Sequence, residues 1–240
     1  LIDTNQKFVY LDPAAGTMAF ASGLLYYIYR KFKKKSEKIS NTFEKWIKKE
    51  FFPNFYAFEI LLVPYILGKI RILSTLETLN VKIDPDNRKL KYLFMNALKI
   101  VPKYDNLETL WQIKSNLERK NQYNEKEEVF IIMGNPPYNL SSENNYPWIN
   151  QKINDYKDGL KEKNLKILSD DYVKFIRFAQ WKLKRKKKGI ISYITNSRFL
   201  EGQMFTILRK KLRENFDYIY IVNLRGDMRK KETGNVFDIR

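Results

Sequence analysis

Short apolar runs alternate along this chain with longer segments in which apolar residues recur at helical spacing. The short runs predict buried strands, and the longer segments predict amphipathic helices. Helices are expected at about residues 18–35, 63–76, 170–187 and 203–215. Strands are expected at residues 8–11, 55–59, 91–95, 129–133, 190–195, 218–223 and 235–240. This alternation predicts an α/β fold, with a doubly wound, mostly parallel, seven-stranded sheet.

Two polar stretches interrupt the alternation. Residues 105–127 predict a helix with a loop, whereas residues 139–169, rich in Asn, Lys and Asp, are too long for a tight connection. We expect the second stretch to be a polar insertion or a mobile lid. Gly189 is expected to end the helix before it as a C-cap. Residues 1–240 are expected to form one domain, and the start without Met indicates a fragment of a longer protein.

The chain is strongly basic. It carries 45 Lys and Arg against 27 Asp and Glu, a net charge of +18, which favours a polyanionic partner such as nucleic acid. Abundant Lys, Asn, Ile, Phe and Tyr are also typical of AT-rich coding sequence, which lowers the weight of the charge. The Lys-rich runs at 30–49 and 182–188 predict salt-sensitive DNA binding. For the first run, however, a solvated helical face is the favoured interpretation.

Cys and His are both missing from the sequence. Their absence excludes the usual zinc sites, thiol nucleophiles and an imidazole general base, so no metal is expected. It also excludes disulfides, which agrees with a reducing cytoplasm. No segment has the run of roughly 18 apolar residues that a membrane span requires, so no membrane partner is expected.

The most informative motif follows the apolar run at 129–133. There the chain passes through Gly134 into Asn135, Pro136, Pro137 and Tyr138. Asn offers an amide oxygen as acceptor, the prolines fix the shape of the turn, and Tyr offers a flat face for stacking. This set suits a planar group with an exocyclic amine, such as adenine, cytosine or a primary amide. A simple strand followed by a proline turn is the alternative.

Two earlier strand ends carry further candidate residues. The first strand runs into Asp12 and a turn of small residues that includes Gly16, and the second ends at Glu59. In doubly wound domains, ligands lie beyond the carboxyl ends of strands. Gly16 lets backbone approach a ligand without a Cβ in the way. The alternatives are an ordinary Asp-Pro turn at Asp12 and an acid favoured by a helix dipole at Glu59.

These motifs, in this order, resemble the gamma-class adenine-specific DNA methyltransferases that use S-adenosylmethionine. The chain is most similar to the methylase region of single-chain restriction–modification enzymes of the type IIG and type ISP kinds. The residues that carry the similarity are Asp12-Pro13-Ala14-Ala15-Gly16-Thr17, Phe58-Glu59, Asn135-Pro136-Pro137-Tyr138 and Gly234-Asn235-Val236-Phe237-Asp238-Ile239. The resemblance runs from about residue 8 to 240 and implies the Rossmann-like fold of S-adenosylmethionine-dependent methyltransferases.

The resemblance also implies roles for individual residues. The Asn135 side chain and the Pro136 carbonyl would accept hydrogen bonds from the two N–H groups of the adenine amine, so that its nitrogen can attack the methyl group. Tyr138 and Phe237 would stack on a base flipped out of double-stranded DNA. Cofactor-binding roles are implied for Asp12, Pro13, Ala14, Gly16, Thr17, Glu59, Asn96 and Phe175. For Phe175 the interpretation as plain helix core is the stronger one.

Departures from the family pattern limit these expectations. Met18 stands where many relatives have a second Gly, which could narrow the cofactor loop. The family's segment before the first strand and its sequence-reading region are expected to lie outside this chain, with nuclease, helicase and target-recognition domains on the same full-length protein. We therefore expect weak cofactor binding by this fragment and do not expect it to methylate alone. The resemblance places the protein in the bacterial cytoplasm.

Two other functions stay open at this point. A protein glutamine-amide methyltransferase also uses an Asn-Pro-Pro-Tyr motif, although the Lys excess, the long polar stretch and the Gly-Asn-Val-Phe segment argue against it. A non-catalytic, methyltransferase-like domain that only positions DNA is the third possibility.

Overall fold

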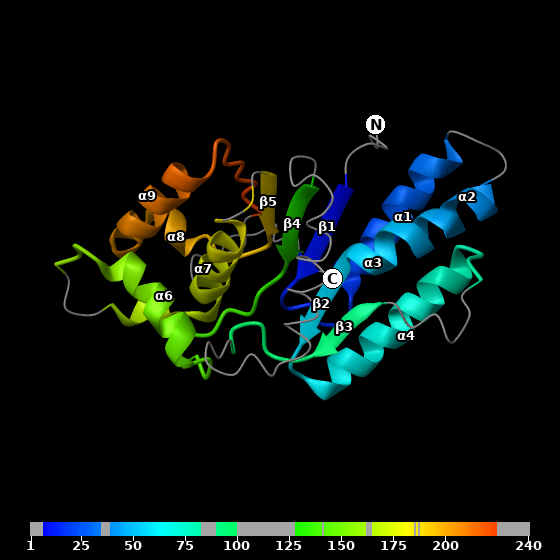
Figure 1. The fold of residues 1–240 in the computed structure, drawn as a ribbon. Helices are drawn as coiled ribbons and strands as arrows, with labels where there is room; N and C mark the ends of the chain where they lie inside the picture. The colour runs from blue at the N-terminus through cyan, green and yellow to red at the C-terminus, as the bar shows by residue number, and fades with distance from the viewer. Residues whose placement is uncertain are drawn as a thin grey trace.

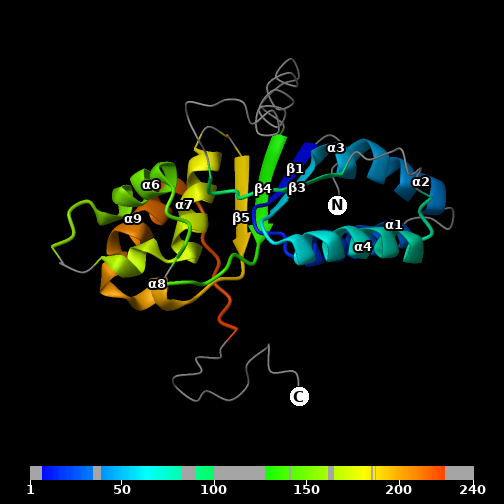
Figure 2. The same cartoon turned by 90° about the horizontal axis from the view of Figure 1, so that it is seen from below.

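A parallel five-stranded sheet forms the centre of the computed structural model, which describes residues 7–34, 39–82, 90–99, 128–140, 142–161, 165–184, 186 and 188–224. The strand order is β3-β2-β1-β4-β5. All neighbouring strands run parallel. The strands are β1 (Lys7–Asp12), β2 (Phe55–Glu59), β3 (Lys91–Phe94), β4 (Glu128–Gly134) and β5 (Lys188–Tyr193). Helices cover both faces, as Figures 1 and 2 show.

The central strand β1 is buried on both faces of the sheet. Tyr10 packs into one hydrophobic cluster, and its neighbours Val9 and Leu11 pack into the other. Successive side chains of a strand point to opposite faces, so an unbroken apolar run such as this one suits a sheet covered on both sides. The α/β fold and the parallel sheet predicted from the alternation of elements are therefore confirmed.

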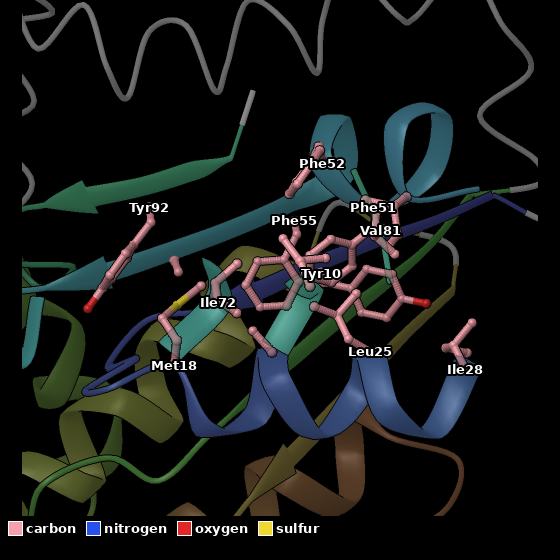
Figure 3. Close-up of a cluster of buried hydrophobic side chains, with 14 of the residues drawn as sticks. Tyr10, Met18, Leu25, Ile28, Phe51, Phe52, Phe55, Ile72, Val81 and Tyr92 are labelled. Carbon is pink, nitrogen blue, oxygen red and sulfur yellow. The ribbon is translucent and has the colours of Figure 1, made fainter. Parts of the chain in front are cut away.

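One face is covered by the helices between β1 and β3. They are α1 (Ala19–Lys33), α2 (Ile39–Trp46), the π-helical η1 (Ile47–Phe51), α3 (Phe52–Asn54) and α4 (Leu62–Thr78). Aromatic side chains dominate this layer, with the Phe51 and Phe55 rings 4.9 Å apart between centroids. Figure 3 shows both rings together with Tyr10 and Leu25. Each such buried ring contributes about 1.5–3 kcal/mol, which fixes α1 and α3 against the sheet.

The other face is covered by helices that follow β4. They are α6 (Pro147–Lys157), the 3₁₀ helix η4 (Lys166–Ser169), α7 (Asp171–Leu183), α8 (Arg198–Glu201), the 3₁₀ helix η5 (Gln203–Phe205) and α9 (Thr206–Asn215). Trp148 of α6 and Phe178 of α7 pack in the cluster beneath the sheet. Tyr156 and Ile176 join a third cluster farther out, between α6, α7 and α9.

Two sequence expectations need correction. Residues 218–223 form no strand of the described sheet, and Tyr218 and Tyr220 are 79% and 87% exposed. Gly189 lies inside β5 and does not cap α7, which ends at Leu183. The polar stretch 139–169 contains α6 and η4, whose buried apolar residues pack with α7, and its interpretation as an insertion or a lid stays a prediction. Helices do occur where they were predicted at 18–35, 63–76 and 203–215.

Several expectations fall on residues outside the described part. The helix and loop predicted at 105–127 and the last strand at 235–240 lie there, so the expected seventh strand has no counterpart in the description. Within the described ranges, no helix is long and apolar enough to cross a membrane. The same ranges hold no group of three or more acidic residues placed to bind a metal ion.

The described parts of the two Lys-rich runs lie at the amino edge of the sheet. Helix α1 begins beyond the carboxyl end of β1 and runs back, so Lys31 and Lys33 at its last turn return to the edge where the strands begin (Figure 1). Lys48 and Lys49 precede β2, and Lys188 is the first residue of β5. The described lysines of both runs are therefore at the opposite edge from the predicted site residues.

Candidate functional site

The strand order places a switch point between β1 and β4, where open α/β sheets have their ligand crevice. The chain leaves β1 toward β2 on one side and returns to β4 on the other, and ligands bind at such a switch point in open α/β sheets. Leu11 is level with Ile132 in the register of these strands. The residues that follow, Asp12 on β1 and Gly134 and Asn135 on β4, therefore meet at the same edge. The predicted first loop and the Asn-Pro-Pro-Tyr motif are brought together there.

The loop after β1 is held by β2 and β3. The Ala15 N–H donates to the Phe58 carbonyl (2.8 Å), and the Gly16 N–H donates to Glu59 Oε2 (2.8 Å). Gly16 has φ +53°, a left-handed conformation that Gly adopts at little cost. Its carbonyl accepts a hydrogen bond from the Tyr92 hydroxyl (2.6 Å). The turn is thus fixed by hydrogen bonds to residues of two strands, β2 and β3.

Glu59 connects the first loop with the start of α4. Besides Gly16, its carboxylate binds the backbone of the next two residues, since Oε1 accepts from the Ile60 N–H (2.8 Å) and the Leu61 N–H (2.7 Å). This contact with the turn before α4 is what the interpretation as an acid near a helix start predicted. Carboxylate oxygens accept more than one hydrogen bond, so capacity remains for ligand hydroxyls. Ribose recognition by Glu59 stays a prediction.

Asp12 is the most deeply buried acid of the site, with 1% of its surface exposed. Its Oδ1 accepts from the Ala14 N–H (3.1 Å). A Cβ on Gly134 would lie 2.8 Å from the same oxygen, so the carboxylate sits directly against β4. Burial raises the pKa of Asp12 to about 7, which the Ala14 N–H partly offsets and the negative charge of Glu59 increases. The Asp12 carboxyl group is therefore expected to change between its neutral and ionised forms near neutral pH.

Three buried polar atoms at this edge have no hydrogen-bond partner within the described structure: Asp12 Oδ2, the Tyr193 hydroxyl and Thr195 Oγ1. Burial, followed by the negative charge of Asp12, raises the pKa of the Tyr193 hydroxyl. A buried polar group without a partner costs about 1–3 kcal/mol, so the group is expected to bind a ligand or water. The arrangement suits a ligand with its own polar and cationic groups.

The Asn-Pro-Pro-Tyr loop leaves β4 at Gly134, whose carbonyl accepts from the Ile194 N–H (3.0 Å). Asn135 is exposed and Pro136 is buried. The Tyr138 hydroxyl donates to Asn135 Oδ1 (2.8 Å), and its ring is 48% exposed. One lone pair of the amide oxygen remains for a second donor. The loop thus presents an acceptor and a ring to solvent on a rigid turn.

The other predicted residues are placed differently. Pro13 is buried, and Ala14 and Thr17 are half-buried in the first loop. The Asn96 side chain is engaged elsewhere, since Oδ1 accepts from the Leu98 N–H (2.8 Å) and Nδ2 donates to Asn144 Oδ1 (2.7 Å). Its proposed contact with a cofactor stays a prediction.

Two aromatic contacts were also predicted, at Phe175 and Phe237. Phe175 is buried in the core beneath the sheet, which agrees with its interpretation as plain helix core. Phe237 lies outside the described residues.

Met18 does not narrow the first loop. It has φ 62° and ψ 32°, so this residue occupies a left-handed conformation that Gly would adopt without strain. Its side chain is buried in the core with Ile72 and Tyr92 (Figure 3). A Cβ on Gly68 would lie 2.9 Å from Met18 Cγ, so Gly68 makes room for it. The core therefore holds Met18 in place.

Tyr193 and Thr195 were missed by sequence reasoning. Both follow the apolar part of β5, two residues apart and hence on the same side of an extended chain. Polar residues at the carboxyl end of an apolar run were the signal that identified Asp12 and Glu59. Applied to residues 190–195, the same signal would have found these two.

The chain resembles known restriction–modification proteins. Residues 18–229 match the family described as Eco57I restriction-modification methylase. A nuclease-deletion mutant of the Type ISP restriction-modification enzyme LlaGI, in complex with a DNA substrate mimic, is similar in structure with a TM-score of 0.71 and 25% identity. The match covers 95% of this chain and 21% of that one.

Two further structures are similar. The ATP-dependent Type ISP restriction-modification enzyme LlaBIII bound to DNA has a TM-score of 0.64 at 23% identity, over 85% of this chain and 14% of that one. A DrdV–DNA complex has a TM-score of 0.60 at 25% identity, over 90% and 19%. This chain thus spans about a fifth or less of these proteins. No curated protein matches it.

Proposed function

The chain belongs to the Eco57I restriction-modification methylase family, and from this premise we propose that it methylates the exocyclic amine of an adenine flipped out of double-stranded DNA, with S-adenosylmethionine as donor. The observation that carries the proposal is the meeting of two groups at the β1/β4 crevice. Asn135 offers an exposed acceptor there, and Asp12 offers a buried carboxylate oxygen without a partner in the described structure.

The residues around Asp12 fit the proposed donor. S-adenosylmethionine carries an electrophilic methyl group on a sulfonium centre and supplies it to the nucleophile. Asp12 Oδ2, the Tyr193 hydroxyl and Thr195 Oγ1 would hold its amino-acid portion, and Glu59 its ribose. A bound cation would favour ionised Asp12 and lower the raised pKa. The turn at Gly16 lets backbone approach the same space.

The residues around Asn135 fit a planar amine. An adenine amino nitrogen is a poor nucleophile because its lone pair is delocalised into the ring. Asn135 Oδ1 and the Pro136 carbonyl would accept hydrogen bonds from its two N–H groups and leave the lone pair directed at the methyl group. The N–C bond would form as the S–C bond of the donor breaks, S-adenosylhomocysteine would leave, and the methylated nitrogen would release one proton to solvent. Tyr138 offers half of its ring surface for stacking and orients the amide through its hydroxyl. This chemistry needs no general base, which suits a chain without His.

DNA is proposed as the substrate on two grounds. The similar LlaGI, LlaBIII and DrdV structures contain DNA or a DNA mimic, and the chain carries a net charge of +18. Those proteins are about five to seven times longer than the matched segment, so we place target recognition, nuclease and helicase functions on further domains of a longer protein. DNA contacts made by this chain are expected at the carboxyl edge.

Methyl transfer from labelled S-adenosylmethionine to duplex DNA, with the modified base identified by mass spectrometry, tests the proposal in the full-length protein. We expect N6-methyladenine, and Asn135→Ala should lower kcat on the order of 10²–10³-fold with DNA affinity nearly unchanged. Unchanged methylation by that variant would contradict the mechanism. Methylation of a protein glutamine in place of DNA would contradict the substrate.

A further inference from the structure

A buried lysine lies behind the Asn-Pro-Pro-Tyr loop. Lys174 belongs to α7 and is fully buried. Its ammonium donates to Ser142 Oγ (2.8 Å), the Asn144 carbonyl (2.8 Å) and Asn145 Oδ1 (3.4 Å). All three acceptors belong to the segment that follows Tyr138 within a few residues. A fully buried Lys is rare unless its charge is satisfied, and here its contacts all go to one loop.

Asp171 completes this group from the first turn of the same helix. Its Oδ1 accepts from Ser142 Oγ and from Asn144 Nδ2 (2.9 Å). Lys174 and Asp171 carry opposite charges, and both bind Ser142 and Asn144 of the loop. Burial lowers the pKa of the Lys174 ammonium, and the negative charge of Asp171 opposes that effect. The two charges are thus neutralised through the loop that they hold.

The start of α7 also holds the residue next to Tyr138. The Asn139 N–H donates to Asp170 Oδ1 (3.0 Å), and the Asn139 carbonyl accepts from the Asp171 N–H (3.3 Å). Tyr172 places its ring edge-on to Tyr138, with centroids 6.4 Å apart. The exposed Tyr138 ring therefore rests on a buried one, and its backbone is fixed on its carboxyl side by two hydrogen bonds.

This network reaches the neighbouring strand. Asn144, which Lys174 and Asp171 both bind, accepts from Asn96 Nδ2 at the end of β3 (2.7 Å). A continuous set of hydrogen bonds thus joins the carboxyl end of β3 to the loop after β4. The network therefore supports the base side of the crevice through the backbone of the loop after β4.

We propose that Lys174 is a positioning residue for methyl transfer: with Asp171 it anchors residues 142–145 and thereby sets the position of Asn135 and Tyr138 against the target base. The inference rests on the proposed function. A reacting group displaced by about 1 Å costs on the order of 10²-fold in rate, so loss of the anchor should lower kcat and leave cofactor affinity unchanged.

The first test replaces Lys174 by Met, which keeps the length of the side chain and removes its charge. In the full-length protein we expect kcat to fall about 10- to 100-fold, while the dissociation constant of S-adenosylmethionine by calorimetry stays within about two-fold. With 2-aminopurine at the target position, the fluorescence of the extruded base should change. Lys210→Met, at an exposed site of α9, is the matched control and should leave all three values unchanged.

Ser142→Ala tests the same contact from the loop if Lys174→Met fails to fold, because it removes only one hydroxyl shared by Lys174 and Asp171. We expect the same pattern with a smaller loss of kcat. Either variant with unchanged kcat, or with equal losses of kcat and cofactor affinity, would overturn the proposal.

Hydrogen exchange separates this proposal from the proposed function. Peptides covering residues 135–146 should exchange faster in Lys174→Met, while peptides from β1 and β2 should not. If the unchanged protein transfers no methyl group, the proposed function fails, but the exchange experiment still decides whether Lys174 anchors the loop. Unaltered exchange in 135–146 would refute the anchor even in an active enzyme.

Discussion

The hydroxyl of Tyr138 donates a hydrogen bond to the side-chain oxygen of Asn135 across 2.8 Å. Tyr138, whose ring would stack on a base, thus also fixes the rotamer of the Asn135 amide, which would accept a hydrogen bond from the amine of that base. Because one lone pair of Asn135 Oδ1 is used in this way, a single further donor can bind there. The Tyr138 side chain therefore combines two roles, because it orients the Asn135 amide and offers a ring for stacking on a base.

Tyr138→Phe separates these two roles. The ring remains, so DNA affinity and base stacking should be nearly unchanged, but the Asn135 amide loses its orienting donor. We expect kcat to fall about 3- to 10-fold, which corresponds to roughly 0.7–1.4 kcal/mol. Tyr138→Ala should lower it further, since stacking contributes about 1–3 kcal/mol per base. Steady-state methylation of duplex DNA measures both, and equal rates for Phe and Ala would contradict the separate role of the ring.

Asp12→Asn should change how stability depends on pH. The folded-state pKa of Asp12 is raised to about 7 from its ordinary 3.8, so between these values the folded chain binds more protons than the unfolded one. The free energy of unfolding should therefore fall as pH rises from 4 to 7 and level off above. The Asn variant should lack this slope and gain about 2–4 kcal/mol at pH 8 relative to the unchanged protein. Urea unfolding at pH 5 and pH 8 measures both, and an identical slope in the two proteins would contradict the assignment.

Gly134→Ala should distort the crevice. Its new Cβ would lie 2.8 Å from Asp12 Oδ1, a distance that forces β4 or the carboxylate to move. We expect a loss of about 1–3 kcal/mol in the free energy of unfolding and weaker binding of S-adenosylmethionine. Gly23→Ala is the control, because nothing lies within 4 Å of a Cβ there and the site is inside α1. That variant should be stabilised by about 0.5–1 kcal/mol, so similar effects of the two changes would contradict the close approach of Asp12.

Neutralising lysines at the amino edge should affect DNA binding little. Lys31, Lys33 and Lys34 are exposed at the end of α1, away from the carboxyl edge where the base would enter. Replacing all three by Gln should leave the DNA dissociation constant at 0.15 M salt within about two-fold. The slope of affinity against salt should also persist. A slope reduced by about 0.9 for each lysine removed would show that this run contacts phosphates.

The main parts of the site could be predicted because polar residues end apolar runs. Asp12, Glu59 and Asn135 each terminate a strand, and parallel pairing brings such ends to one edge whatever the helices do. The anchor at Lys174 could not be found in this way. It depends on contacts between α7 and residues 142–145, which are set by tertiary packing and leave no spacing in the sequence.

Two errors have physical causes. Position 189 needs a glycine because Leu183 packs against it: Leu183 Cδ2 lies only 2.8 Å from where a Cβ would be. The glycine does not cap α7. Residues 218–223 have the aromatic and β-branched composition of a strand, but composition does not supply a neighbour to pair with. Propensity therefore predicted a strand where the structure assigns none.

Strand β5 is the last strand of the described sheet, so its outer edge has no partner strand there. Nearby in sequence, Tyr218, Tyr220 and Val222 expose their apolar side chains to water. An unpaired sheet edge and an exposed β-prone segment both favour self-association, so concentrated solutions of the chain should form aggregates with added β-structure. Charged substitutions at 218, 220 and 222 would make the chain more soluble without touching the methylation chemistry.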